Sequence, residues 1–151
     1  MAIARGAGTE IIRSAMFEDI DGSAYTPLIV GVQHHIYTVL SIMIHAETIA
    51  TTGNLAEVVL LGYDAKGGTT ARTVRLFKEI VPLGSTFVWN DKFSFNGAEP
   101  ANFTGPMDDT TKQDAIADQG STPVSQILKV AGSQAGDKFN VTITYIDQNN
   151  A

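Results

Sequence analysis

The chain has 151 residues and a formal net charge of −6; hydrophobic residues make up 44% of it and charged residues 17%. This length suits one domain with its own core, and the balance of residues argues against wholesale disorder. Lys and Arg are sparse, which argues against nucleic acid or an anionic membrane as a partner. No apolar run is long enough to span a bilayer, and we see no secretory signal. The absence of cysteine excludes disulfides and thiolate chemistry.

The N-terminal segment differs from the rest of the chain. Met1–Gly8 is small and Gly-rich, whereas Glu10–Ile20 fits a helix or a strand, and Asp21–Ser23 ends it. We predict that residues 1–24 form an N-terminal arm or first strand that packs onto something else, such as another subunit. Residues 25–151 then form the folded domain.

A strand with two apolar faces is predicted at Ile36–His45, where β-branched residues are frequent. We expect its even-numbered residues to lie in the core. The odd-numbered face is also apolar, at Tyr37, Val39 and Met43. This second face needs a cover, and the arm or a neighbouring subunit is the candidate.

A hairpin is predicted next. Glu57–Tyr63 is apolar on both faces, which is typical of a central strand or of one covered by a partner. Asp64–Gly68 has the composition of a turn, Arg72–Val81 is the following strand, and Pro82–Ser85 breaks it.

Two further strands follow the same period of two. Aromatic residues line one face of the segment 87–95, and we expect one strand to run through it without a hairpin turn at Asn90 and Asp91. The last strand alternates the apolar residues Phe139, Val141, Ile143 and Tyr145 with polar ones.

Between Asn96 and Thr122 the strand pattern lapses into a long polar loop, with a short helix conceivable at Thr110–Asp118. Short strands separated by Gly and Pro turns indicate an all-β fold. We therefore predict an antiparallel β-sandwich, jelly-roll-like or immunoglobulin-like, with the N-terminal arm and this one long loop.

The three histidines are the first candidates for chemistry, and the sequence separates them. His34 and His35 are neighbours and would point to opposite faces of a strand, while His45 lies ten residues beyond His35. An ion site would need ligands from other strands. The aspartates at 19–23 fail the calcium-loop spacing, and no GxSxG or phosphate loop is present. We predict no catalytic, cofactor or metal residues and no enzyme activity.

A resemblance to a known family rests on four pieces of the chain: HHIYTVLSIMIHAET, VVLLGYDAKGG, IVPLGSTFVWNDKF and DKFNVTITYIDQ. Over roughly residues 26–148 the chain resembles small β-sandwich virion proteins of tailed bacteriophages. The resemblance implies a capsid cement (decoration) protein, commonly a homotrimer, that is made in the host cytoplasm and placed on the outer surface of the virion. Its partner there would be the major capsid protein. The Asn96–Thr122 loop departs from the shorter relatives, which leaves its role open.

The sequence-based hypothesis is thus a structural virion protein that binds the outside of an icosahedral capsid. The alternative is a tail-associated or host-glycan-binding module, in which the aromatic stripe around Trp89 would be exposed. The candidate interface with the capsid or another subunit has three parts. The arm supplies the apolar anchors Ile11, Ile12, Met16 and Phe17 and the ion-pair donors Arg5 and Arg13. The second apolar face supplies Tyr37, Val39 and Met43.

Overall fold

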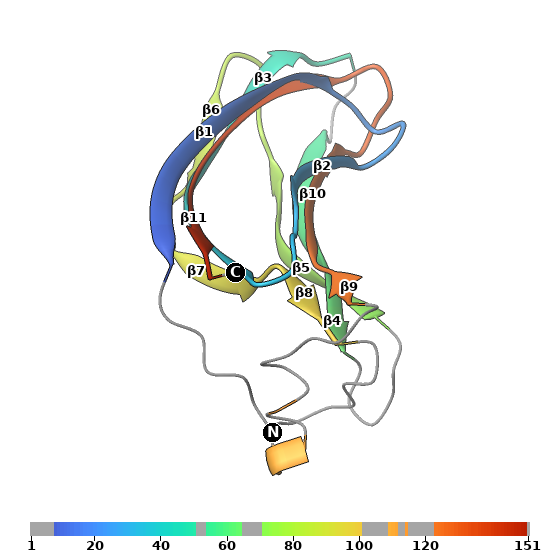
Figure 1. Cartoon of the computed structure of the whole chain (residues 1–151). Helices are drawn as coiled ribbons and strands as arrows, with labels where there is room; N and C mark the ends of the chain where they lie inside the picture. Colours follow the sequence, from blue (N-terminus) through green and yellow to red (C-terminus); the bar gives the residue numbers. More distant parts are fainter. Residues whose placement is uncertain are drawn as a thin grey trace.

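The chain folds into two antiparallel sheets that pack face to face (Figure 1). The computed structural model describes residues 8–50, 54–64, 71–100, 109–111, 114 and 123–150. The strands are β1 (Thr9–Ile20), β2 (Thr26–Val30), β3 (His35–Thr48), β4 (Leu55–Asp64), β5 (Ala71–Ile80), β6 (Thr86–Trp89), β7 (Phe93–Asn96), β8 (Ala98–Glu99), β9 (Val124–Ser125), β10 (Ile127–Gly132) and β11 (Lys138–Asn149). The predicted all-β sandwich is confirmed.

The order of the strands identifies the sandwich as a jelly roll. Sheet A runs β1-β11-β3-β6, with β7 also on β3, and sheet B runs β2-β10-β4-β5. β6 and β7 occupy one position, because β6 pairs with the second half of β3 and β7 with the first half. Apart from the pairs β4–β5 and β6–β7, successive strands of sheets A and B cross from one sheet to the other, as in an eight-stranded jelly roll and not as in an immunoglobulin domain.

The core lies between the inner faces of the two sheets. Sheet A contributes Ile42, Ile44, Val141 and Ile143, and all four are fully buried. Sheet B contributes Val58, Leu60, Leu128 and Val130, each at most 1% exposed. The alternation in β11 predicted this arrangement, since residues two apart in a strand share a face.

β3 changes face in its middle, which corrects one prediction. Thr144 of β11 lies opposite Ser41, and Tyr145 lies opposite Val39, so Leu40 is an extra residue in the ladder. This bulge reverses the alternation. Ile42 and Ile44 face the core as predicted, but in the first half of the strand Tyr37 and Val39 face the core instead of Ile36.

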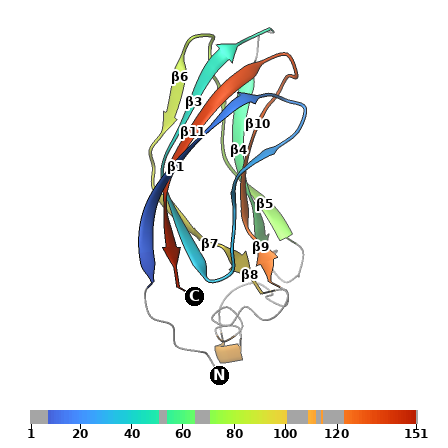
Figure 2. The same ribbon diagram turned by 45° about the horizontal axis from the view of Figure 1, so that its top comes forward.

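The first strand is part of sheet A. β1 pairs with β11 along its length, and its Ile20 is buried. Residues 9–20 are thus a strand of the sandwich. Residues 1–7 lie outside the described part of the chain. Figure 2 shows β1 at the edge of the sheet, alongside β11.

The hairpin agrees with the sequence, the aromatic segment forms two strands, β6 and β7, instead of one, and β2, β8, β9 and β10 were missed. β4 lies between β10 and β5, and β4 and β5 pair antiparallel, although residues 65–70 of their connection lie outside the described part. β6 and β7 continue along β3 past Asn90 and Asp91 without a hairpin. β2 and β10, of five and six residues, were not predicted.

The long loop begins and ends on a short ladder. β8 lies within the segment predicted as loop, and it pairs with β9 on the far side. Thr110, Thr111 and Asp114 are helical, and the rest of the predicted helix at 110–118 lies outside the described residues. No helix among the described residues is long and apolar enough to cross a membrane.

We predict that Ile143→Ala lowers the free energy of unfolding by about 2–5 kcal/mol, because it leaves a cavity in the core. Ile146→Ala is the matched control, since Ile146 lies three residues further along β11 on the outer face. We expect that change to cost less than about 1 kcal/mol. Urea unfolding of both variants checks this, and equal losses would contradict the assigned faces of β11.

Candidate functional site

The outer face of sheet A carries exposed apolar side chains of β1, β3 and β6 in one row of the sheet. Met16 of β1 lies opposite Thr142, which lies opposite Met43, which lies opposite Val88 of β6. Met16, Met43 and Val88 are 57%, 40% and 50% exposed. A second row runs through Ile12, Ile146, Thr38 and Ser94.

None of the residues in these rows is charged, nor are Ser14, Thr144 and Ser41 between them. We call this surface the neutral face, and it consists of Ile12, Ser14, Met16, Thr38, Ser41, Met43, Val88, Ser94, Thr142, Thr144 and Ile146. Depletion of charge with exposed apolar residues is the composition found at the centre of protein interfaces.

Hydroxyl groups on the neutral face bond to one another across the strands. The Ser14 and Thr144 hydroxyls lie 3.2 Å apart, and those of Thr38 and Ser94 lie 2.8 Å apart. A polar group that already has a partner costs less to remove from water than one that must give up its water. The neutral face can therefore be covered by a partner with a small desolvation cost.

The predicted interface residues divide into three groups. Ile12, Met16 and Met43 lie together on the neutral face, whereas Ile11, Arg13 and the half-buried Phe17 share the inner face of β1. Tyr37 and Val39 are 3% and 0% exposed, so the prediction that they form an outward apolar face is wrong, and the bulge at Leu40 is the reason. Arg5 lies outside the described residues.

Sequence reasoning missed Val88 and Ile146 as members of the neutral face. The signal was present for the latter, because Ile146 continues the alternation of β11 and falls on the same side as Thr142 and Thr144. Val88 lies between Phe87 and Trp89, so the period of two places it on the face opposite the aromatic stripe. What the sequence did not supply was the register that brings these residues next to Met16 and Met43.

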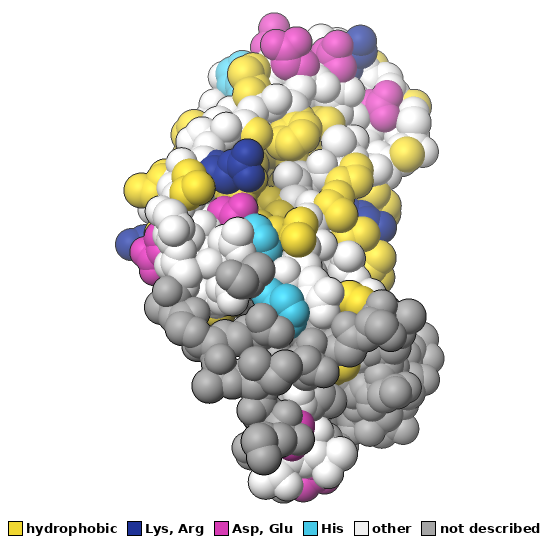
Figure 3. Space-filling model, viewed as in Figure 1, with side chains coloured by type: hydrophobic (Ala, Val, Ile, Leu, Met, Phe, Trp, Pro, Cys, Tyr) yellow, Lys and Arg dark blue, Asp and Glu magenta, His cyan; other side chains and the backbone are white. Residues whose placement is uncertain are grey.

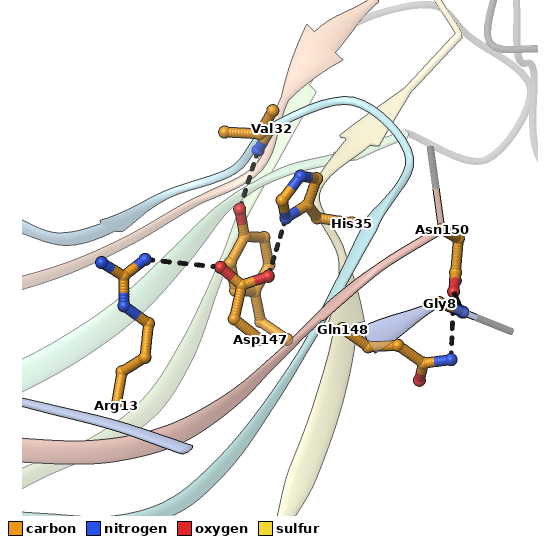
Figure 4. Close-up of polar contacts among 8 residues, drawn as sticks. Gly8, Arg13, Val32, His35, Asp147, Gln148 and Asn150 are labelled. Carbon is orange, nitrogen blue, oxygen red and sulfur yellow. Dashed lines mark hydrogen bonds and ion pairs between the residues drawn. The ribbon is translucent and has the colours of Figure 1, made fainter. Parts of the chain in front are cut away.

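A polar cluster ties β1 to β3 on the inner side of sheet A (Figure 4). Asp147 of β11 forms an ion pair with Arg13, with 3.5 Å between Oδ2 of the carboxylate and Nη1 of the guanidinium. The other carboxylate oxygen, Oδ1, lies 2.7 Å from Nδ1 of His35. The carboxylate is 12% exposed, the His35 ring 17%, and the Arg13 side chain 58%. Figure 3, viewed onto the side where β1 and β2 lie, shows charged and histidine side chains among hydrophobic ones between the two sheets.

Tyr37 lies beside this cluster and fixes the chain before β3. Its hydroxyl accepts a hydrogen bond from the backbone N–H of Val32 at 3.1 Å, and its ring stacks on Phe95 and on His35. Burial raises the pKa of the Tyr37 hydroxyl above its usual value of 10.0, and the nearby Asp147 charge adds to that rise. The cluster is therefore a structural support for this end of sheet A.

The histidines do not meet at one place. His34 lies in the turn before β3 with φ of +66°, His35 binds Asp147, and Nδ1 of His45 lies 2.8 Å from the Thr86 hydroxyl. Among the described residues, no group of three His, Asp or Glu side chains is placed to hold a metal ion.

The aromatic stripe of β6 and β7 faces the core. Trp89 stacks on Phe77 of sheet B, with ring centroids 5.3 Å apart, and Phe87 packs against the same ring at 5.0 Å. Phe95 is 3% exposed and stacks on Tyr37. These rings join the two sheets, so they do not form the exposed sugar platform that a glycan-binding module would need.

The outer face of sheet B differs from the neutral face because charged groups cross it. Glu57 accepts hydrogen bonds from the Tyr25 hydroxyl and from Nε of Arg75, the latter at 3.0 Å. The hydrogen bond to Glu57 raises the pKa of the Tyr25 hydroxyl above 10.0, and burial raises it further. An apolar partner would have to desolvate these charges, which disfavours this face for docking.

No protein-family model matches the chain, and no curated protein matches it. A solved structure of Bacillus endospore appendages, described as disulfide-linked pili, has a TM-score of 0.45 and 12% identity, and the alignment covers 100% of this chain and 97% of that one. The T13 IBDV viral particle gives a TM-score of 0.40 and 8% identity, covering 96% of this chain and 36% of that one. At these TM-scores neither likeness carries an argument about function.

We predict that Asp147→Asn lowers the free energy of unfolding by about 1–3 kcal/mol, because it weakens the contacts with both Arg13 and His35. Asp91→Asn is the control, since Asp91 is exposed between β6 and β7 and should change stability by less than about 0.5 kcal/mol. Urea unfolding measures both. Equal effects would show that the cluster contributes nothing specific.

Alkaline pH should destabilise the fold through Tyr25 and Tyr37. Both pKa values are raised above 10.0 in the folded chain, so the unfolded chain releases these protons first as pH rises. The stability that they contribute is present below pH 10 and is lost as pH rises through the folded pKa values.

Urea unfolding between about pH 8 and pH 11 measures the slope of stability against pH. In Tyr37→Phe we expect a shallower fall above pH 10, even though that variant starts from lower stability. An unchanged slope in Tyr37→Phe would show that the folded and unfolded pKa values of Tyr37 are the same.

Proposed function

We propose that the chain is a structural virion protein, a cement (decoration) protein that binds the outside of an icosahedral phage capsid and stabilises contacts of the major capsid protein. The observation that carries this proposal is the neutral face, with Met16, Met43 and Val88 exposed in one row. Proteins that stay monomeric and unattached seldom expose apolar residues in such a continuous arrangement.

The physical demands of cementing agree with the sandwich. A clamp must hold its contact residues in fixed positions, and the neutral face rests on a sheet whose opposite side is buried in the core. Residues on a rigid sheet lose little conformational entropy on binding. The net charge of −6 also suits a position outside the shell, away from packaged DNA.

The proposed role is mechanical and requires no enzyme activity, metal or cofactor. Its partners are the major capsid protein and other copies of the chain, and its location is the outer surface of the virion after synthesis in the host cytoplasm. The tail-associated or glycan-binding alternative has no comparable support among the described residues, since the aromatic stripe faces the core.

A direct test is to find where the chain is located. Particles purified by density gradient from the producing host should contain it in many copies, and immunogold should label the heads. Label confined to tails would favour the alternative, and a chain found only in the soluble fraction would contradict both functions.

We predict that Val88→Lys reduces co-sedimentation with purified shells that lack the chain by at least about tenfold in apparent affinity, because docking would bury an ammonium group without a partner. Val30→Lys is the matched control. Val30 has nearly the same exposure, 56% against 50%, but it lies on β2 in sheet B. Weakened binding by Val30→Lys alone would assign docking to the other sheet.

A further inference from the structure

The four edges of sheets A and B are not equally protected. β2 has five residues, contains Pro27 and has a register shift against β10. β5 has two register shifts against β4, and it carries Arg75 and Lys78. β6 and β7 are four residues each, with Lys92 between them. Short length, proline, bulges and charged residues are the features that keep sheet edges from pairing with other chains.

β1 lacks these features over most of its length. The ladder from Thr9 to Phe17 has no register shift, and the first irregularity comes between Phe17 and Ile20. No described strand pairs with its outer edge. Alternate N–H and C=O groups of an edge strand point away from its sheet, so this regular stretch is a template for another strand.

The side chains beside this edge are apolar on both faces. Ile11 of the inner face and Ile12 and Met16 of the neutral face are 56%, 68% and 57% exposed. Arg13 is the only charge between Ile11 and Phe17, and its guanidinium is turned to Asp147 at 3.5 Å. The outer edge of β1 thus presents apolar side chains on both faces, beside backbone groups that no described strand pairs with.

We propose that a second copy of the chain pairs antiparallel with β1 about a twofold axis at Ser14. In that register Ile12 lies opposite Met16 of the partner subunit, and Ile11 lies opposite Phe17 of the partner subunit. Arg13 lies opposite the small Ala15 of the partner subunit, which leaves room for the Arg13 ion pair with Asp147.

Neighbouring registers fit less well. Moving the axis to Arg13 places two guanidinium groups opposite each other, and moving it to Ala15 places Ile12 opposite Glu18 of the partner subunit. An axis midway between two consecutive residues would place inner-face residues of one copy opposite outer-face residues of the other, which a continuous sheet does not allow. The pairs formed by residues 11–17 therefore favour Ser14, although Glu10 then lies opposite Glu18 of the partner subunit at each end.

The pairing joins the two copies of sheet A into one continuous sheet. A twofold axis perpendicular to the sheet keeps both neutral faces on the same side, so each dimer presents twice the surface proposed for docking. The inference goes beyond the proposed function, because it concerns the free protein and needs no capsid. It replaces the trimer implied by the family resemblance with a closed twofold dimer.

Native mass spectrometry and sedimentation of the full chain at about 50 µM test the pairing, and we expect a dimer. Ser14→Lys places two ammonium groups opposite each other at the axis and should weaken the dimer at least tenfold or so. Ser94→Lys is the matched control, because Ser94 shares the neutral face and the same kind of cross-strand hydroxyl pair but lies on β7. It should leave the dimer intact.

A second variant acts in the opposite direction and does not depend on the folding of Ser14→Lys. Glu10 lies opposite Glu18 of the partner subunit at each end of the pairing, so Glu10→Lys should tighten the dimer several-fold, while Glu79→Lys on β5 should not. A monomer or trimer of the unmodified chain, or a dimer unaffected by both Ser14→Lys and Glu10→Lys, would overturn the proposal. Capsid binding by a strictly monomeric chain would overturn it and leave the proposed binding to the major capsid protein intact.

Discussion

The two ladders along β11 determine both the core and the outer surface of this protein. β11 pairs with β1 on one side and with β3 on the other, and its residues alternate between the faces. Val141 and Ile143 are buried, while Thr142 and Thr144 lie outward among Met16, Met43 and Ser14. A slip of one residue would exchange the two faces. The packing of the core therefore also fixes the composition of the surface that a partner would meet.

The neutral face reconciles solubility with docking. Its hydroxyl pairs keep it compatible with water in the free chain, yet they need no further partner when the face is covered. Its exposed methionines suit an imperfectly matched surface, because the thioether side chain is flexible and polarizable. Beside it, the regular and unprotected edge of β1 offers a second mode of contact that uses backbone groups. A subunit with both features can assemble in the plane of its sheet and dock through the face of that sheet.

The sequence predicted the sandwich because period-two alternation is strong in β11 and in the aromatic segment of β6 and β7. It failed where the pattern carried no information. In β3 apolar residues lie on both faces, so the odd spacing between the outward polar residues Thr38 and Ser41 was not recognised as the bulge that turns Tyr37 and Val39 inward. β2 and β10 are short, and Pro27 obscured the first. Ile12, Met16 and Met43 were predicted as contact residues, but their common face follows from a register that one strand cannot reveal.

Hydroxyl-radical footprinting of the chain on intact particles, compared with the free chain, tests the central claim most directly. Met43 of the neutral face is 40% exposed, and Tyr25, which precedes β2 and donates a hydrogen bond to Glu57 on the outer face of sheet B, is 45% exposed. The account predicts that Met43 becomes protected from oxidation on the particle while Tyr25 keeps its reactivity. Protection of Tyr25 with unchanged oxidation of Met43 would contradict it.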